Sequence, residues 1–443
     1  MPFRADIVVC SNLHKEVAEG VELIVGLPSK DPWSLPFVHK HIFAERIDRY
    51  DLFIYSEDDV LITERNLEAF LEVSQVLSAE EIAGFLRIEK AADGTVYYPE
   101  VHHRFHWIPS SVRRRGQFIL ASFSNQHSAC YILTKQHLRR AIRSGGFLVG
   151  PHHSKYDLLC SAATDPYTQC GFTKLVCISH LDSFLVHHLP NKYLDKLGTV
   201  SADVNRQIDS LLSVAAKGTS GHSLFETEPS SLRLPYSTYY CKDYYEPVRR
   251  DIVSLITADV GDVLSIGCGW GATEEALASR GMRVIAIPLD PVIGACARAR
   301  GIEVIDAAFD ALPVALAGQR FSCILLSNTL HLIDAPDSLL RSLRTFLTDG
   351  GRIVAIVPNV RWIRSIWQEL RHDGVFSGSH KCLRPAVHNT SPRVLRSWFH
   401  SAGLRINKLL PVFHHQREST GHMLGGLTPP LFASELVAIA SVS

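Results

Sequence analysis

Residues 57–59 place three carboxylates in a row between two apolar runs. The segment reads YDLFIYSEDDVLITE over residues 50–64, so Glu57, Asp58 and Asp59 follow a stretch with the composition of a buried strand. Carboxylates this close repel one another unless a cation lies between them. Mg²⁺ and Mn²⁺ take one or two protein carboxylates and complete their shells with water and phosphate oxygens. The acids therefore indicate either a divalent metal site or a solvated acidic turn.

A second candidate site is a glycine-rich turn. The stretch DVLSIGCGWGATEEAL places Gly267, Gly269 and Gly271 between a predicted strand and a predicted helix. Glycine lets the backbone turn tightly and approach a ligand closely, and a helix N-terminus offers unpaired N–H groups. Taken alone, this spacing is compatible with a dinucleotide site or with a plain turn. A phosphate-binding P-loop is excluded because no Gly-Lys-Ser/Thr follows.

The elements around these residues indicate two α/β domains. Over residues 1–200, runs such as ADIVVCSN, VELIVGLP and DLFIYS are typical of strands, and PFVHKHIFAERIDRY and NLEAFLEVSQVLS of helices. Residues 201–235 are rich in Ser, Thr, Gly and Pro and are predicted to be a linker. Over residues 236–443 strands alternate with helices, which predicts a doubly wound parallel sheet with ligands at the carboxyl ends of its strands.

Length and composition limit the classes of function. The chain has 443 residues, which favours two domains, and its 45 basic and 45 acidic residues balance, so no charge excess points to nucleic acid. No apolar run reaches the ~20 residues of a transmembrane helix, and the N-terminus lacks the layout of a signal peptide. The 10 cysteines include no CxxC pair, which is typical of reduced thiols. We therefore predict a cytoplasmic protein, free or peripheral at the inner face of the membrane.

The stretch from about residue 236 to 411 resembles a class I S-adenosylmethionine-dependent methyltransferase. The resemblance rests on VLSIGCGWG, RVIAIPLDP, EVIDAAFDAL, LLSNTLHLIDAPDSLLRSLRTFLTDGGRIVAIVPN and HNTSPRVLRSWFHSAGL, in that order. It implies S-adenosylmethionine as cofactor, with the three glycines against its amino-acid part and an acid after the second strand on the ribose hydroxyls. The cofactor-binding residues implied by the resemblance are Gly267, Gly269, Gly271, Asp290, Asp306 or Asp310 near the adenine, and Asn328.

Two positions depart from the pattern of that family. Ser265 stands where the first strand usually carries an acid, and Pro288 where the second strand usually ends on one, so that Asp290 is the nearest replacement. A methyltransferase-like domain that no longer methylates is therefore an alternative. Methyl transfer is an in-line displacement for which positioning supplies much of the rate. For a hydroxyl acceptor that needs a base, His331 and His388 are the candidates, and each is also compatible with a packing role.

The N-terminal half resembles a GT-A-type glycosyltransferase, a Rossmann-like α/β fold. The resemblance rests on DPWSLPFVHKHIFAERIDRYDLFIYSEDDVLIT and on SKYDLLCSAATDPYTQCGFTKLVCISHLDSFLVHHLPNKYL. It implies Mn²⁺ or Mg²⁺ in a site that a late histidine completes, an acid as catalytic base, and a lysine on a phosphate. The residues that it implies are Glu57, Asp58 and Asp59 with His187 or His188 for the metal, Asp157 as the base, and Lys192 for the phosphate. Only about fifty residues precede the acids, so the nucleotide pocket is abbreviated.

Three functions are compatible with these features. The first is a bifunctional carbohydrate enzyme that transfers a sugar from a nucleotide-sugar donor and methylates a glycan, or a lipid-linked saccharide precursor, on oxygen. The second is a methyltransferase whose N-terminal domain binds a glycan without catalysis. The third is a scaffold protein built from two degenerate enzyme folds. We expect no nucleic-acid partner and no transmembrane segment.

Overall fold

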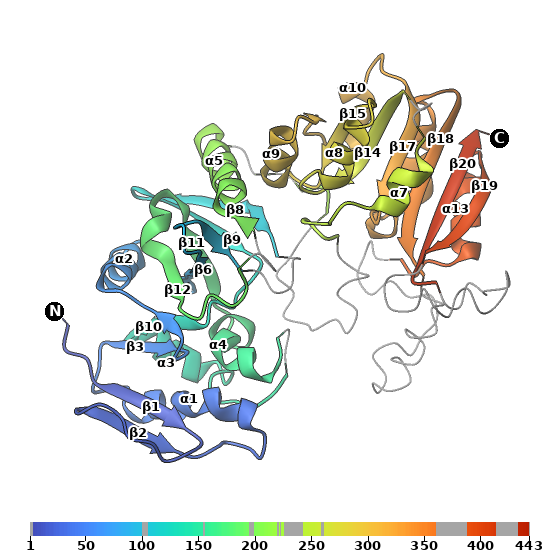
Figure 1. Cartoon of the computed structure of the whole chain (residues 1–443). Coiled ribbons are helices and arrows are strands. Elements are labelled where there is room, and N and C mark those ends of the chain that lie inside the picture. Colours follow the sequence, from blue (N-terminus) through green and yellow to red (C-terminus); the bar gives the residue numbers. More distant parts are fainter. Residues whose placement is uncertain are drawn as a thin grey trace. The chain divides into compact units, whose positions relative to one another are not determined.

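The computed structural model describes residues 3–99, 105–153, 156–194, 199–218, 221, 223–225, 242–257, 261–359, 388–412 and 433–442. The chain divides into two compact units (Figure 1). Unit 1 comprises Met1–Gly221 and Thr227–Pro235, and unit 2 comprises His222–Glu226 and Tyr236–Ser443. In the described residues, no helix combines the length and the apolar composition that a membrane span requires.

Unit 1 is a mixed α/β unit with short strands. Its helices are η1 (Pro32–Phe37), α1 (Val38–Glu45), α2 (Glu64–Ser74), α3 (Lys135–Arg143), α4 (Leu158–Thr168), η2 (Ile178–Phe184) and α5 (Ser201–Lys217). Its strands are β1 (Ile7–Ser11), β2 (Val21–Val25), β3 (Leu52–Ser56), β4 (Val60–Leu61), β5 (Glu81–Ala83), β6 (Leu86–Lys90), β7 (Val96–Tyr98), β8 (Trp107–Arg115), β9 (Phe118–Phe123), β10 (Cys130–Thr134), β11 (Thr173–Cys177), β12 (Leu185–His188) and β13 (Thr199–Val200).

These strands pair in several small sheets. Their orders are β1-β2, β10-β3, β5-β11-β9-β8 and β13-β7-β6-β12-β4. The predicted buried strand before the acids is β3, but it pairs antiparallel with β10, far along the chain, and not with β1 or β2. The described residues of unit 1 therefore do not form the single Rossmann-like sheet that the sequence predicted.

Part of the predicted linker is a helix that belongs to unit 1. In α5 the side chains of Val204, Ile208 and Leu211 are buried, at a spacing of three to four residues. This apolar face contacts β7, β8 and β9. The linker prediction is wrong over residues 201–217, because frequent Ser and Ala residues obscured a helical apolar stripe.

Unit 2 is built on one seven-stranded sheet of order β16-β15-β14-β17-β18-β20-β19. Strands β14 to β18 run parallel, and β20 lies antiparallel between β18 and β19. The strands are β14 (Asp262–Cys268), β15 (Arg283–Pro288), β16 (Glu303–Val304), β17 (Phe321–Ser327), β18 (Leu347–Pro358), β19 (Leu404–Val412) and β20 (Glu435–Val442). The helices are α7 (Arg250–Leu255), α8 (Ala272–Ala278), α9 (Pro291–Ala299), η3 (Phe309–Ala311), α10 (Leu312–Ala315), η4 (Leu330–Leu332), α11 (Pro336–Arg344) and α13 (Pro392–Ser401).

Helices cover both faces of this sheet, as a doubly wound fold requires (Figure 1). Residues of α7, α8 and α9 pack on one face, and residues of α10, α11 and α13 pack on the other. The order of the strands reverses at β14, which has β15 on one side and β17 on the other. Ligands of open α/β sheets bind at the carboxyl ends of the strands beside such a reversal. The glycine loop follows β14 and therefore lies at that place.

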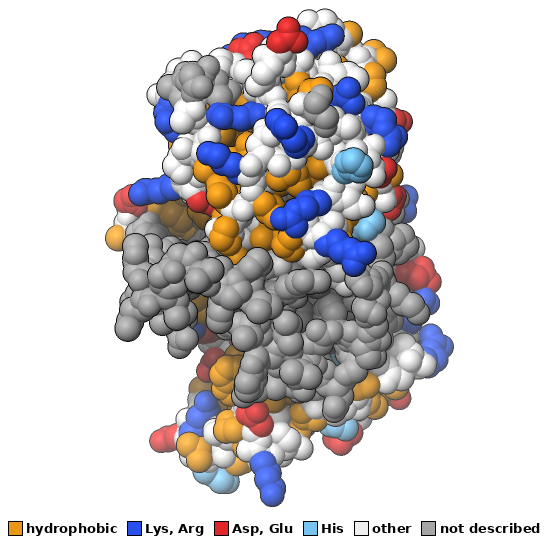
Figure 2. Space-filling model, turned by 90° about the vertical axis from the view of Figure 1, so that its right-hand side faces the viewer, with side chains coloured by type: hydrophobic (Ala, Val, Ile, Leu, Met, Phe, Trp, Pro, Cys, Tyr) orange, Lys and Arg blue, Asp and Glu red, His pale blue; other side chains and the backbone are white. Residues whose placement is uncertain are grey.

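One face of unit 2 carries mainly basic side chains (Figure 2), although the charge of the whole chain is balanced. Figure 2 shows Lys and Arg as the main charged side chains on the face above the grey atoms. Exposed basic residues of α11, α13 and β19 are Arg341, Arg344, Arg393, Arg396, Arg405 and Lys408. The balanced composition of the whole chain does not reveal this basic face.

Candidate functional site

The glycine loop after β14 is enclosed by two other segments. Gly267 has φ +77°, and a Cβ there would stand 2.2 Å from Thr329 Cγ2. A Cβ on Gly269 would stand 2.3 Å from the carbonyl oxygen of Tyr244. The loop thus lies against the segment that follows β17 and against the segment that precedes α7. Three stretches of chain meet at the carboxyl edge of the sheet.

Buried charged groups hold the segment before α7 at this edge. Lys242 Nζ donates to the carbonyl oxygen of Ser327 and to Glu246 Oε2, both at 2.7 Å. The guanidinium of Arg249 donates to Glu246 Oε1 at 3.2 Å and to Glu435 Oε2 at 2.7 Å. Lys242 and Arg249 are almost fully buried. The sequence patterns did not single out any of these ionic residues, since the segment has no motif and its partners lie far along the chain.

Two side chains after β17 leave buried oxygen atoms without a hydrogen-bond partner in the described part of the chain. They are Asn328 Oδ1 and Thr329 Oγ1. Asn328 has φ +50°, an unusual conformation for a non-glycine residue, and its Nδ2 donates to Glu435 Oε1 at 2.7 Å. A buried oxygen without a donor costs free energy, so a ligand that brings N–H or O–H groups would be favoured here. The predicted cofactor residue Asn328 therefore lies at the same edge as the glycine loop.

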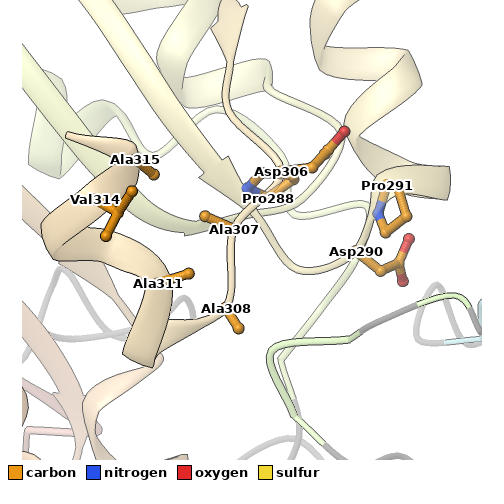
Figure 3. A pocket seen from close by; sticks show the side chains of 9 residues that line it. All are labelled: Pro288, Asp290, Pro291, Asp306, Ala307, Ala308, Ala311, Val314 and Ala315. Carbon is orange, nitrogen blue, oxygen red and sulfur yellow. The ribbon is translucent and has the colours of Figure 1, made fainter. Parts of the chain in front are cut away.

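A cavity of about 370 Å³ opens beyond β15 (Figure 3). Small apolar residues of the β16–α10 region form one wall, and the start of α9 forms the other. Its lining residues are Pro288, Asp290, Pro291, Asp306, Ala307, Ala308, Ala311, Val314 and Ala315. The predicted residues Asp290 and Asp306 meet at this cavity, whereas Asp310 is exposed and does not line it. A narrow apolar cavity with acids at its rim suits a flat aromatic base joined to a sugar.

Asp290 begins helix α9 from a buried position. Its Oδ1 accepts hydrogen bonds from the N–H groups of Val292 (2.8 Å) and Ile293 (2.9 Å). Burial raises the pKa of Asp290 to about 7, although these two N–H groups and the Tyr244 side chain favour its ionised form. The Asp-Pro pair is an N-cap followed by proline at the first helical position, which the sequence shows directly.

A carboxylate from another element contacts Ser265, the residue that stands where the first strand of the family usually carries an acid. Ser265 Oγ donates to Glu274 Oε1 at 2.7 Å, and both residues are buried. Glu274 lies in the first turn of α8, and its side chain reaches Ser265 in β14. Its negative charge there is favoured by the N-terminal end of the helix. The sequence reasoning missed Glu274, because the contact depends on how α8 folds back onto β14.

Burial and hydrogen bonds to the backbone, which are typical of a structural role, characterise the two candidate bases. His331 lies in η4 and is 1% exposed. His388 Nε2 lies 2.8 Å from the carbonyl oxygen of Ile333 and must carry a proton to donate to it. The backbone N–H of His388 in turn donates to the carbonyl oxygen of His331 at 2.8 Å. A nitrogen that already donates cannot accept a proton from a substrate, so this geometry argues against His388 Nε2 as a base.

In unit 1, the three acids occupy the turn between β3 and β4 but have different surroundings. Glu57 Oε1 lies 3.3 Å from His127 Nε2. Asp59 Oδ2 lies 3.2 Å from His188 Nε2, and Asp59 Oδ1 is buried without a hydrogen-bond partner in the described residues. Asp58 is exposed. The turn is therefore not uniformly solvated, because two of its acids face histidines.

Strand pairing decides between His187 and His188. Strand β12 pairs antiparallel with β4, with His188 opposite Val60, and the N–H of Leu189 donates to the carbonyl oxygen of Asp59 at 2.8 Å. Neighbouring residues of a strand point to opposite faces. His188 accordingly lies beside Asp59, while His187 Nε2 lies 3.0 Å from Asn191 Oδ1.

The remaining predicted residues of unit 1 are Asp157 and Lys192, which have other contacts. Asp157 Oδ1 caps α4 by accepting the N–H of Cys160 at 2.9 Å. Burial raises the pKa of the Cys160 thiol, and the charges of Asp157 and Glu57 raise it further. Lys192 is exposed, with its Nζ 5.2 Å from the centre of the Tyr193 ring. The structure thus gives Asp157 a structural role as the N-cap of α4.

The described donor atoms of unit 1 supply only part of the coordination shell of a divalent ion. Among the described residues, no three or more His, Cys, Asp or Glu side chains are grouped around one metal position. Asp59 and His188 alone offer two donor atoms 3.2 Å apart. Two ligands about 2.1 Å from an octahedral ion and at right angles to each other are about 3.0 Å apart. The pair thus fits an ion that takes its other ligands from water or a substrate.

Comparisons with known proteins concern unit 2. Residues 240–409 match the family model described as methyltransferase domain. A ubiquinone biosynthesis O-methyltransferase of Xylella fastidiosa (strain M23) is 34% identical over 119 residues, which are 26% of this chain and 48% of that protein. The enzyme of the same name from Coxiella burnetii (strain Dugway 5J108-111) is 22% identical over 174 residues, 38% of this chain and 74% of that protein. The chain spans about half the length of the first of these relatives.

The solved structures that resemble part of this chain, at low TM-scores, include methyltransferases. The CcbJ methyltransferase from Streptomyces caelestis has 18% identity and a TM-score of 0.33, with 43% of this chain and 86% of that chain covered. An O-methyltransferase from neocarzinostatin biosynthesis has 15% identity and a TM-score of 0.32, with 44% and 53% covered. The conclusion about the family rests on the sequence match over residues 240–409 and on the sheet described above. Unit 2 contains a class I S-adenosylmethionine-dependent methyltransferase domain.

Proposed function

We propose that unit 2 transfers the methyl group of S-adenosylmethionine to a hydroxyl oxygen of a small-molecule acceptor. The observation that carries the proposal is the convergence of the glycine loop, Asp290 and the donor-lacking oxygens of Asn328 and Thr329 at one edge of the sheet. The relatives named for ubiquinone biosynthesis are O-methyltransferases, which supports oxygen as the accepting atom. The chain covers only part of those relatives, so their names do not define its acceptor. The proposal therefore also includes hydroxyl groups of glycans.

We assign each residue to the part of the cofactor that its chemistry suits. The glycine loop admits the amino-acid part, and Asn328 Oδ1 and Thr329 Oγ1 are acceptors suited to its ammonium group. We assign to Asp290 the hydrogen bonds of the ribose hydroxyls and to the alanine-lined cavity the base, because Asp290 and Asp306 both line that cavity. When bound, the cofactor supplies an electrophilic methyl group on a sulfonium. The protein must then hold the acceptor oxygen in line with that methyl group.

Protonation of Asp290 should make cofactor binding depend on pH. Its pKa is about 7, and only the carboxylate accepts hydrogen bonds with both oxygens. Raising the pH from about 6 to about 8 increases the ionised fraction of such a group about tenfold. The dissociation constant of adenosylhomocysteine, measured by calorimetry, should fall about tenfold over this range in the wild type and stay level in Asp290→Asn. A flat profile in the wild type would remove Asp290 from the ribose site.

The proposed activity is tested with radiolabelled S-adenosylmethionine and the full chain. Acceptors should include catechol-type phenols and saccharides, with label counted in the extracted product. We expect transfer to at least one hydroxyl acceptor, and production of adenosylhomocysteine that depends on it. If the protein binds adenosylhomocysteine but turns over none of the acceptors, the proposed acceptor class is wrong. A protein that fails to bind adenosylhomocysteine at all would match the alternative of a domain that no longer methylates.

For unit 1 we propose a second activity, metal-assisted glycosyl transfer from a nucleotide sugar. The specific observation in its favour is the pairing of Asp59 with His188 at the end of a buried strand. A Mg²⁺ or Mn²⁺ ion held there would take phosphate oxygens of the donor and offset the charge that develops on the leaving diphosphate. Joined to unit 2, this unit would deliver a glycan or lipid-linked saccharide to methylation at high effective concentration. The alternative for unit 1 is glycan binding without catalysis.

A further inference from the structure

A fully buried carboxylate stands behind the Asp59–His188 pair. Glu89 is 0% exposed, although acidic residues are almost never fully buried unless they are paired. It lies in β6, which pairs parallel with β12 through Ile88 and His187, so Glu89 comes beside His188. Its Oε1 lies 2.5 Å from His188 Nδ1, and its Oε2 accepts the backbone N–H of Tyr193 at 2.9 Å.

The imidazole of His188 is restrained from three directions. Glu89 holds Nδ1, and the ring of Tyr193 stacks on the imidazole with centroids 5.7 Å apart and an interplanar angle of 16°. The third contact is Nε2, which lies 3.2 Å from Asp59 Oδ2. The His188 side chain is 3% exposed, so it has little freedom to adopt another rotamer. Nε2 is therefore the ring nitrogen that is directed at the acidic turn.

We propose that Glu89 is a positioning residue that prepares His188 as a metal ligand. By accepting the hydrogen bond that Nδ1–H donates, the carboxylate fixes the tautomer in which the lone pair of Nε2 points to the cation position beside Asp59. A carboxylate behind a ligating histidine also makes the ring a stronger ligand, and removing such a partner lowers metal affinity by about 10–100-fold. The inference rests on the metal site proposed for unit 1 and adds to it a residue that no motif indicated.

A purely structural role for Glu89 predicts different behaviour. Burial of a carboxylate costs free energy that burial of an apolar residue of similar size does not, so packing alone does not explain Glu89. If Glu89 only anchored the chain through Tyr193, its neutral analogue would alter stability and leave metal affinity unchanged. Asn191 provides a matched control, because its side-chain Oδ1 anchors the same loop by accepting the N–H of Lys90 at 2.9 Å. Its hydrogen bond to the carbonyl oxygen of His188, at 3.3 Å, is made by the backbone N–H, which a glycine at this position keeps. Its φ of +50° is compatible with glycine.

The experiment titrates Mn²⁺ into the full chain with UDP or GDP present and follows free Mn²⁺ by electron paramagnetic resonance. Pulsed spectra of the bound ion report ¹⁴N coupling, the signature of a histidine ligand. We expect Glu89→Gln to raise the dissociation constant of Mn²⁺ about 10–100-fold and to weaken the ¹⁴N coupling. Asn191→Gly should change neither quantity.

Failure of the inference and failure of the metal site are distinguishable. If the wild type binds Mn²⁺ with ¹⁴N coupling and Glu89→Gln binds equally well, Glu89 is structural and the inference is overturned. If the wild type binds no Mn²⁺ with either nucleotide, the proposed metal site itself is wrong. Glu89→Asp keeps the buried charge but withdraws it from Nδ1, so it replaces Glu89→Gln if that variant does not fold. The same loss of affinity is expected from it, and unchanged affinity contradicts the inference.

Discussion

Gly269→Ala is expected to reduce the affinity of the protein for adenosylhomocysteine at least about 100-fold, or about 2.7 kcal/mol. The added Cβ would stand 2.3 Å from the carbonyl oxygen of Tyr244 and 3.0 Å from its carbonyl carbon. These are backbone atoms, so no side-chain rotation relieves the contact. The same carbonyl accepts the N–H of Trp270 at 2.9 Å, which ties the two segments together. Relief requires that the glycine loop or the segment before α7 moves, and both enclose the cofactor site.

The measurement is a calorimetric titration of adenosylhomocysteine into folded protein. Gly261→Ala is a matched control, because its Cβ would meet no atom within 4 Å and the residue lies just before β14. We expect the control to bind like the wild type. Circular dichroism must show that both variants keep their secondary structure. Undiminished affinity in a folded Gly269→Ala variant would place the cofactor elsewhere than at the glycine loop.

Asp59→Asn is expected to abolish the mutual dependence of Mn²⁺ and nucleotide diphosphate binding in unit 1. In the wild type each ligand should raise the affinity of the other by the same factor, as thermodynamic linkage requires. Asp59 is one of two donor groups that face each other, and an amide is a much weaker ligand for a hard cation than a carboxylate. Loss of one of the two protein ligands should cost at least as much Mn²⁺ affinity as loss of an outer-shell partner, which is about 10–100-fold, and should leave no measurable coupling.

The neighbouring acid supplies the control for this experiment. Asp58 is exposed, whereas Asp59 has a buried oxygen and a histidine partner. Titrations of UDP and GDP with and without Mn²⁺ should therefore show coupling in wild type and Asp58→Asn, but not in Asp59→Asn. Both variants should bind adenosylhomocysteine normally, since unit 2 has its own core. Equal damage from both substitutions would indicate a diffuse electrostatic effect, and absence of coupling in the wild type would indicate a solvated turn.

The sequence by itself determined most of unit 2. Strands buried on both faces read as continuous apolar runs, and β14, β15 and β17 stand out for that reason. Gly267, Gly271 and the Asp290-Pro291 pair act through local backbone conformation, which neighbouring residues specify. A parallel alternation of strands and helices then leaves few possible sheet orders. The glycine loop and Asp290 could therefore be assigned to one edge of the sheet before any contact was known.

Only the tertiary structure decided which side chains meet across strands and between elements. Asp59, Glu89 and His188 come together because β12 pairs with both β4 and β6 in a particular register. The alternation of residues along a strand shows which side chains share a face, but it does not show which strand lies alongside. For the same reason, the sequence left His187 and His188 equivalent and gave no indication of Glu89. The contact of Glu274 with Ser265 was also hidden, because it depends on how α8 packs against β14.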